Sequence, residues 1–187
     1  SFWPQLSSYD QYLFNEGTHL QAYEHLGAHL RRIDQVQGVY FAVWAPNAQR
    51  VSVVGEFNHW DGRCHPMRSL GASGIWELFL PHLEEGAHYK YELLSAEGKL
   101  LLKADPYAFA AEAPPRSASV VRDTTTYTWE DQKWMASRAQ QHWWDSPLCI
   151  YEVHLGSWRR APEHNQPLSY RDLAHQLVDY VLEMGFT

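Results

Sequence analysis

The stretch Val51-Ser-Val-Val-Gly-Glu-Phe-Asn-His-Trp-Asp-Gly62 predicts a strand that ends in a turn carrying a large aromatic side chain. Successive side chains of an extended chain point to opposite faces, so Val51 and Val53 share one face of this strand. Asn58 and the Asp-Gly pair that closes the stretch are turn formers, and they end the strand at Asn58. Trp60 is therefore expected on a polar loop.

Trp60 has two interpretations. A flat, apolar indole presented on a loop suits stacking against the C–H faces of a sugar ring, with its apolar surface covered by the ligand. The alternative is that the indole folds back over the edge of a β-sandwich and serves packing alone. The chemistry of the residue leaves both interpretations open.

The composition is that of a globular protein with one core, or one core and part of a second, in 187 residues. The hydrophobic content of 45% includes no long apolar run, so no membrane span is expected. A net charge of −7 without a Lys/Arg cluster argues against a nucleic-acid partner. Two cysteines, Cys64 and Cys149, are too few for a disulfide framework and favour a cytoplasmic location.

The pattern along the chain divides it into residues 1–34, a lead-in segment packed along the next domain, residues 35–125, a domain of short strands, and residues 126–187. In the lead-in, His25 and His29 have the four-residue spacing of a metal-binding pair on a helix. The glycine between them and the lack of a third ligand favour a surface pair. We therefore predict no metal site and no cofactor.

The middle part predicts a mainly β fold, an immunoglobulin-like antiparallel β-sandwich, because turn signals recur every 8 to 15 residues and no long helix intervenes. Tyr89 and Tyr91 alternate with Lys90, which should therefore point outward. The strands are expected at Gly38–Ala45, Arg50–Phe57, Gly74–Leu80, His88–Ser95, Lys99–Lys103 and Ala118–Arg122.

The last part predicts a linker helix over 130–141 capped by Thr128, an apolar strand over 149–155, and a final helix that Ser169 starts and Gly185 ends. A strand and a helix are two thirds of a parallel crossover unit, so the chain is expected to be a fragment of a larger enzyme. The apolar stripe of the final helix is expected to pack on the sandwich or on a neighbouring chain. That stripe consists of Leu173, Leu177, Tyr180, Val181 and Met184.

No catalytic residues are predicted in the chain. Retaining glycosyl transfer needs two carboxyl groups about 5 Å apart across the scissile bond. Glu84 and Glu85 flank a turn, Asp105 precedes a proline in a structural turn, and Glu152 stands alone on its strand. The fragment is therefore expected to be catalytically inactive.

An ordered set of motifs resembles the family 48 carbohydrate-binding module that precedes many enzymes of the alpha-amylase superfamily. The motifs are Phe41-Ala-Val-Trp-Ala-Pro-Asn-Ala48, Gly55-x-Phe57-Asn58-x-Trp60, Gly74-Ile-Trp-Glu77, Tyr89-Lys-Tyr-Glu92 and Lys103-Ala-Asp-Pro-Tyr-Ala108. Further on, Ile150-Tyr-Glu-Val-His-Leu-Gly-Ser-Trp158 is similar to the first strand of the (β/α)8 barrel of bacterial 1,4-alpha-glucan (glycogen) branching enzymes. The resemblance implies a sandwich followed by the first strand and helix of a truncated barrel.

This resemblance implies a carbohydrate-binding site at Trp60, Lys90 and Asn58 for alpha-glucan such as glycogen or maltooligosaccharides. The family's site has a second tryptophan on a nearby turn. In this chain Leu100 occupies that turn, so the second aromatic surface for a sugar is absent. The parent enzyme would cleave an alpha-1,4-glucan and reattach the segment through an alpha-1,6 bond, with catalytic acids on later barrel strands. The partners implied are the glucan and the rest of the barrel, with self-association of the fragment through the truncated barrel elements.

Three other functions stay open. The chain could be a noncatalytic glycogen-targeting module, although the strand and helix after residue 149 argue against it. It could be a fragment of a debranching or trehalose-forming relative with the same plan. The sandwich could also brace the barrel without binding glucan.

Overall fold

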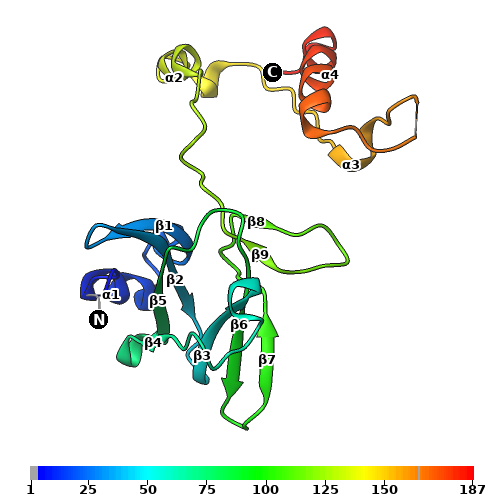
Figure 1. Cartoon of the computed structure of the whole chain (residues 1–187). Coiled ribbons are helices and arrows are strands. Elements are labelled where there is room, and N and C mark those ends of the chain that lie inside the picture. Colours follow the sequence, from blue (N-terminus) through cyan, green and yellow to red (C-terminus); the bar gives the residue numbers. More distant parts are fainter. Residues whose placement is uncertain (1–3, 164) are drawn as a thin grey trace. The chain divides into compact units, whose positions relative to one another are not determined.

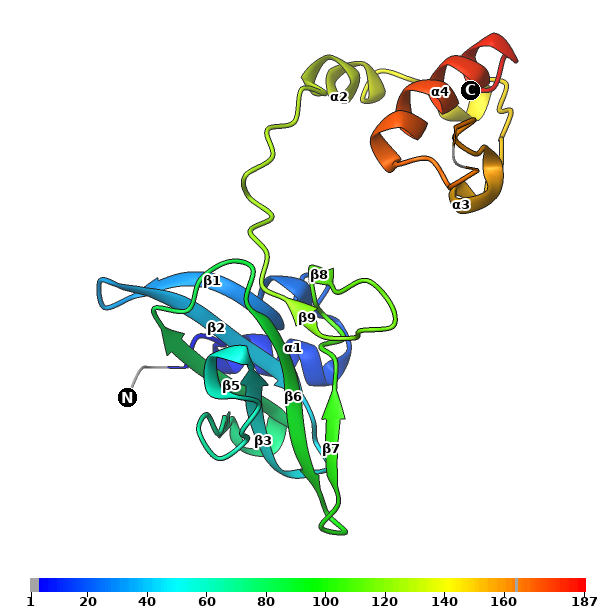
Figure 2. The same cartoon turned by 45° about the vertical axis from the view of Figure 1, so that its right-hand side comes forward.

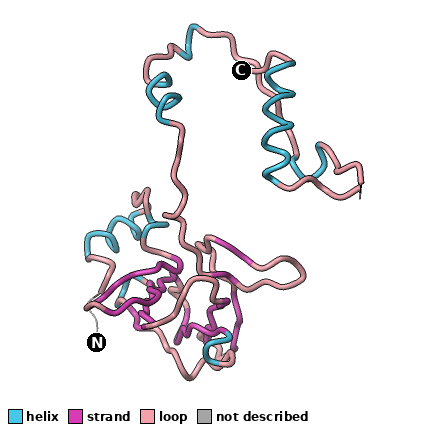
Figure 3. Tube along the Cα trace, turned by 45° about the horizontal axis from the view of Figure 1, so that its top comes forward, coloured by secondary structure: helices cyan, strands magenta, loops and turns pink. Residues whose placement is uncertain are grey.

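The structure, a computed structural model, describes residues 4–163 and 165–187 (Figure 1). The chain divides into two units, of which the first ends at Thr128 and the second begins at Trp129. Among the described residues, every strand belongs to the first unit, and the second unit consists of helices and loops (Figure 3).

The first unit is a sandwich of two antiparallel sheets, which confirms the predicted mainly β fold. The strand order is β1-β2-β5-β4 in the first sheet and β3-β6-β9-β8 in the second, where β7 also pairs with β6 (Figure 2). The first sheet comprises β1 (Gly27–Ile33), β2 (Val36–Trp44), β4 (Arg68–Ser69) and β5 (Ile75–Pro81). The second comprises β3 (Ala48–Gly55), β6 (His88–Ser95), β7 (Leu100–Lys103), β8 (Ala110–Ala111) and β9 (Ser119–Val120).

The main hydrophobic core lies between the two sheets, because each strand turns alternate side chains inward. Val39 and Phe41 on β2 belong to the same buried cluster as Val53 on β3 and Tyr89 and Tyr91 on β6. The rings of Phe41 and Tyr89 meet edge to face with their centroids 5.0 Å apart. These contacts join β2 of the first sheet to β6 of the second.

The outer face of the first sheet is covered by the segment that precedes β1. Helix α1 (Ser8–Glu16) begins at a capping box formed by Ser7 and Asp10, and it ends at Gly17. A 3₁₀ turn, η1 (Ala22–Glu24), follows. A second apolar cluster joins this segment to the outer face of the sheet, and its buried members are Leu6, Leu26, Tyr40, Ala42 and Ile75.

Two features of residues 1–34 differ from the sequence-based expectation. The segment contains a regular helix, α1, stabilised by its caps rather than by an amphipathic pattern. Residues 27–33 form β1, which pairs with β2 along its whole length, so the sandwich includes residues before 35. The other strands were recognised by alternating apolar and polar residues. The run His29-Leu-Arg-Arg32 has no such alternation, because most of its side chains are exposed, and this strand was therefore not predicted.

Glu77 shows the consequence of covering this outer face. Glu77 alternates along β5 with the residues that face the main core, so its side chain would be expected in solvent. It is instead completely buried. The Tyr40 hydroxyl donates to Glu77 Oε2 over 2.9 Å, and Arg68 pairs with the other carboxylate oxygen. Burial raises the pKa of Tyr40, and the neighbouring Glu77 charge raises it further. The carboxylate is thus satisfied inside the second cluster.

The second unit contains α2 (Gln132–Arg138), η4 (Trp143–Asp145), α3 (Leu155–Trp158) and α4 (Tyr170–Glu183). The predicted cap of α2 is wrong: the residue before the helix is Asp131, and its side chain makes no capping bond. The predicted start of α4 is confirmed, because the Ser169 hydroxyl accepts from the backbone N–H of Asp172.

The predicted strand over residues 149–155 is not formed. Within the described part of the chain these residues have no partner strand, and Thr187 supplies the backbone contact to Cys149, at 3.1 Å. Pairing defines a strand, so the apolar sequence alone does not produce one.

Part of the apolar stripe of α4 packs within the second unit. Leu173 is buried, and Tyr180 lies against the rings of Tyr151 and Trp158 at centroid distances of 5.5 and 5.7 Å. The indole N–H of Trp158 donates to the Tyr151 hydroxyl over 2.9 Å. In the described residues, the helices are all too short or too polar to cross a membrane.

Candidate functional site

Trp60 stands on a turn that the backbone holds in an uncommon conformation. After β3 the chain enters η2 (Glu56–Asn58), and His59 and Trp60 then have positive φ angles of 54° and 60°. A bulky residue in this region costs about 1–3 kcal/mol, and such strain is concentrated at functional sites. The Trp60 N–H donates to the Gly55 carbonyl over 2.9 Å, which closes the turn. The indole remains 38% exposed.

Gly55 is required at the start of this turn because a side chain would not fit. A Cβ at this position would lie 2.2 Å from the carbonyl oxygen of His88 and 2.4 Å from the ring of Phe57. The close approach of β3 to β6 therefore fixes where the turn leaves the sheet. The far end is held by Arg63, whose guanidinium hydrogen bonds lower the pKa of Asp61 to about 2.

Asn58 orders this turn and does not present itself to a ligand. It is 6% exposed, its Oδ1 accepts from the Gly55 N–H over 2.9 Å, and its Nδ2 donates to the Val53 carbonyl over 2.9 Å. The same amide nitrogen lies 2.9 Å from His65 Nδ1. Its amide is already bonded to the protein, so the structure places Asn58 inside the turn that carries Trp60 and not on the exposed surface.

Lys90 projects from the outer face of β6, as the alternation with Tyr89 and Tyr91 predicts. It pairs in register with Val54, one residue before the glycine that begins the Trp60 turn. Its Nζ donates to the Ser117 hydroxyl over 2.9 Å. The ammonium keeps further donor capacity, since a lysine has three N–H bonds.

Trp60 and Lys90 line the same open depression on the second sheet, with a volume of ≈ 540 Å³. Leu102 of β7 and Pro115 add apolar surface, and polar groups stand beside them. The remaining lining residues are Glu56, Glu112, Arg116, Ser117 and Ala118. An indole face next to donors and carboxylates is the combination that holds a neutral sugar, whose ring has apolar C–H faces and a rim of hydroxyls.

The structure adds residues to this site that the sequence analysis missed. Leu102 is 52% exposed and shares a strand face with the exposed Leu100. Two leucines at alternate positions of a short strand could have indicated an apolar surface on that face. Arg116 and Ser117 belong to a loop between β8 and β9, and nothing in their local sequence marks them. Only the folding of that loop toward Lys90 brings them to the site.

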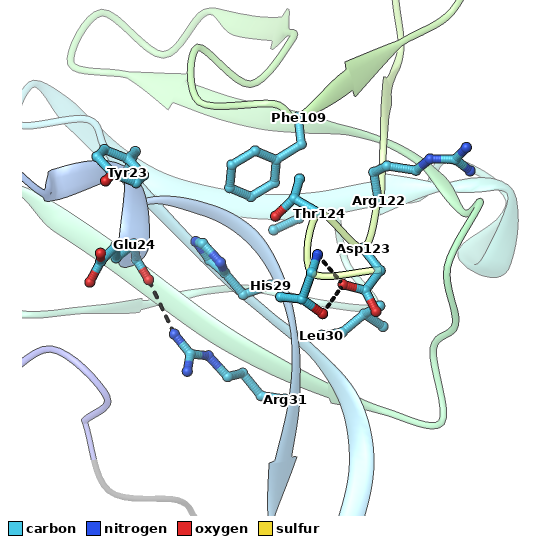
Figure 4. Close-up of a pocket in the computed structure, with 11 residues that line it drawn as sticks. Tyr23, Glu24, His29, Leu30, Arg31, Phe109, Arg122, Asp123 and Thr124 are labelled. Atoms are coloured by element: carbon cyan, nitrogen blue, oxygen red, sulfur yellow. Dashed lines mark hydrogen bonds between the residues drawn. The ribbon is translucent and has the colours of Figure 1, made fainter. Parts of the chain in front are cut away.

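A second hollow, of ≈ 370 Å³, lies beside β1 (Figure 4). Its aromatic residues are Tyr23 and Phe109, and Phe109 meets the His29 ring at 5.3 Å. Two of its charged groups already bond to protein: Arg31 donates to the Glu24 carbonyl, and Asp123 accepts from Thr125. Burial lowers the pKa of His29, which favours its neutral form. Among the described residues, the hollow has no tryptophan in its lining, so it lacks the indole surface of the Trp60 depression and is the weaker candidate.

His25 and His29 do not form the pair that their spacing allows on a helix. His29 lies on β1 and its Nε2 is 3.0 Å from the Leu26 carbonyl oxygen. His25 instead lies near His19 and Asp10, and these three offer ligand atoms within 4.8 Å of one another. The sequence analysis missed this cluster because the third ligand comes from α1, 15 residues upstream.

Among the carboxylates considered in the sequence analysis, Asp105 is the most deeply buried, and it bonds to residues of the core. Burial raises the pKa of Asp105, whereas hydrogen bonds from the Tyr89 and Tyr91 hydroxyls and the Tyr107 N–H lower it. At 6% exposure the carboxylate has no access to a polymer. It is a structural residue, as the sequence predicts.

The comparisons with known proteins bear on both units. Residues 25–108 match the family described as carbohydrate-binding module 48 (isoamylase N-terminal domain). The whole chain is 56% identical to 25% of the 1,4-alpha-glucan branching enzyme of Rhodospirillum rubrum, and 48% identical to 26% of that of Protochlamydia amoebophila. A crystal structure assigned as an alpha amylase of Salmonella typhimurium superposes with a TM-score of 0.60 and 26% identity, over 87% of this chain and 23% of that one. The chain thus spans about a quarter of the length of the curated relatives it matches.

Proposed function

Because residues 25–108 match the model of carbohydrate-binding module 48, we propose that the chain is the glucan-binding, noncatalytic amino-terminal part of a 1,4-alpha-glucan branching enzyme. The ligand proposed is alpha-glucan, as a glycogen chain or a maltooligosaccharide. The site proposed is the depression lined by Trp60 and Lys90.

The observation that carries the binding role is the placement of Trp60 next to Lys90. The two residues are 30 positions apart in the chain, and the strained turn after β3 places the indole in the lining that Lys90 shares. A glucose ring on the indole would direct its hydroxyls toward Lys90 Nζ and the Glu56 carboxylate. Leu102 would extend the apolar floor.

The affinity expected for one such site is low. Covering an indole face removes roughly 100 Å² of apolar surface, which contributes about 2–3 kcal/mol at ~25 cal/mol per Å². Association costs at least about 4 kcal/mol before any net binding remains. Together with a few hydrogen bonds, this gives a Kd of roughly millimolar at best. A branched polymer presents many chains, so that many weak contacts act together.

The parent activity is proposed from the relatives, which are named 1,4-alpha-glucan branching enzymes and match the chain along its full length. In this proposal residues 126–187 are the linker helix and the first elements of the catalytic barrel. Residues 149–155 would become a strand once the neighbouring barrel strands pair with them. The free thiols of Cys64 and Cys149 agree with a cytoplasmic enzyme.

Affinity electrophoresis in gels containing glycogen tests the binding role. The wild-type chain should be retarded relative to a glycogen-free gel, and Trp60→Ala should lose most of that retardation. Trp134→Ala is the matched control, because it removes an indole that is 53% exposed on α2 and does not line the depression. Equal retardation of the wild type and Trp60→Ala would contradict the site and favour a bracing role for the sandwich.

A further inference from the structure

We propose that Asp10, His19 and His25 form a binding site for a divalent transition-metal ion of the zinc type. The three residues come from separate parts of the segment before β1. Asp10 lies in the first turn of α1, His19 follows the end of α1, and His25 follows η1. The site is independent of the glucan depression, whose lining includes none of them.

The distances between the candidate ligand atoms are close to those of a coordination sphere. Asp10 Oδ1 lies 3.4 Å from His19 Nε2 and 3.9 Å from His25 Nε2. Zinc binds nitrogen and oxygen at about 2.0–2.2 Å, so two ligands of a tetrahedral site are ~3.3 Å apart. The two imidazoles meet edge to face at a centroid distance of 5.5 Å. The candidate ligand atoms of all three residues lie within 4.8 Å of one another, so small side-chain rotations would complete the geometry.

His19 provides an independent indication that something is bound here. Its side chain is nine-tenths buried, and its Nε2 is shielded from solvent without a hydrogen-bond partner. A buried ring nitrogen left unpaired costs about 1–3 kcal/mol. This nitrogen lies 3.4 Å from Asp10 Oδ1 without the alignment of a hydrogen bond. Metal coordination would supply the missing partner.

Asp10 is arranged to give one oxygen to the ion. Its Oδ2 accepts from the Ser7 hydroxyl at 2.6 Å and from the Ser7 N–H at 3.1 Å, which leaves Oδ1 facing the two histidines. The helix cap thus orients the ligand, as outer partners do in metal sites.

Two imidazoles and one carboxylate select the class of ion. Imidazole suits zinc, copper, nickel and iron, whereas magnesium and calcium prefer all-oxygen sites. Three protein ligands leave a fourth position for water. The partial exposure of Asp10 and His25, 23% and 26%, leaves room on that side. A bound ion would tie α1 to the loop that leads into β1.

Equilibrium dialysis of the chelator-treated whole chain against Zn²⁺ tests the proposal. One equivalent of zinc should bind saturably, and His19→Gln and His25→Gln should each weaken binding by at least about tenfold, since loss even of outer-shell partners costs 10–100-fold. His175→Gln is the matched control, because it removes an exposed histidine of α4 outside the cluster and should bind like the wild type.

Two further measurements separate coordination from a packing role of the histidines. Co²⁺ in place of zinc should give a visible d–d spectrum that His25→Gln changes while its near-ultraviolet circular dichroism stays that of the wild type. Zinc at 100 times the wild-type Kd should raise the melting temperature of the wild type by on the order of 5 °C, and that of His25→Gln by no more than about half as much. Absence of saturable zinc binding, or equal binding by the wild type and both glutamine variants, would overturn the proposal.

Discussion

The Tyr89 hydroxyl donates a 2.7 Å hydrogen bond to Asp105 Oδ2, and both side chains are buried between strands of the second sheet and the segment that follows β7. Tyr91 donates to the same oxygen over 3.0 Å. The backbone N–H of Asp105 in turn donates to the Ser119 hydroxyl of β9. One carboxylate therefore fixes the route by which the chain passes from β7 to β9.

Replacing this carboxylate should destabilise the first unit. Asp105→Ala leaves two buried phenols and the Tyr107 N–H without their acceptor, and each unpaired buried group costs about 1–3 kcal/mol. We expect the free energy of unfolding to fall by about 2–5 kcal/mol in urea titrations followed by tyrosine and tryptophan fluorescence. Glu84→Ala, an exposed carboxylate on a turn, is the control and should change it by less than about 0.5 kcal/mol.

The buried phenols also predict how stability depends on alkaline pH. Burial raises the pKa values of Tyr40, Tyr89 and Tyr91 above the ordinary value of 10.0, and neighbouring carboxylates add to the shift. A phenol whose folded-state pKa is raised stabilises the fold fully below pH 10 and loses that contribution as pH rises above it. Ultraviolet titration should show these three phenols ionising above pH 10, together with unfolding. Ionisation of all the tyrosines near pH 10 in the folded chain would contradict this.

The buried amide of Asn58 predicts an indirect effect on glucan binding. Asn58→Ala removes the acceptor of the Gly55 N–H and the donor to the Val53 carbonyl, so the turn should loosen and the indole should lose its fixed orientation. Stability should fall by about 1–3 kcal/mol, and glycogen retardation should weaken although Trp60 is present. If Asn58→Ala lowers the stability but leaves glycogen binding unchanged, the hydrogen bonds of Asn58 do not control the orientation of the Trp60 indole.

The sequence predicts those parts of the fold in which local pattern and tertiary environment agree. Tyr89, Lys90 and Tyr91 alternate because β6 has one face in the core and one face outward, and their faces were assigned correctly. Glu77 follows the same alternation on β5 but is buried, because α1 and its flanking residues cover that face. The local sequence of β5 does not indicate that α1 and its flanking residues cover this face.

The candidate site was predictable only in part, for a similar reason. Trp60 and Lys90 were found from the turn signal and from the resemblance, and the pairing of β3 with β6 brings them to one depression. The sequence does not show that the Asn58 amide is used inside the turn, because asparagine is suited both to turns and to sugar binding; its hydrogen bonds show this. The metal-type cluster escaped detection because its members meet through the return of the chain after α1.

Lys90 provides the sharpest test of how the depression works. Lys90→Met keeps the apolar stem and removes the ammonium, so a glucan would lose one hydrogen-bond donor, worth about 0.5–1.5 kcal/mol or roughly 2–13-fold in Kd for a maltooligosaccharide. Lys90→Arg keeps a charged donor and should retain more of the affinity. Ser117→Ala is the control for the internal bond, since it removes the partner of Lys90 Nζ and leaves the ammonium free to bind sugar. Titration by isothermal calorimetry or nuclear magnetic resonance gives the three Kd values. If Lys90→Met and Ser117→Ala weaken binding equally, Lys90 acts by fixing the loop between β8 and β9 rather than by contacting the glucan.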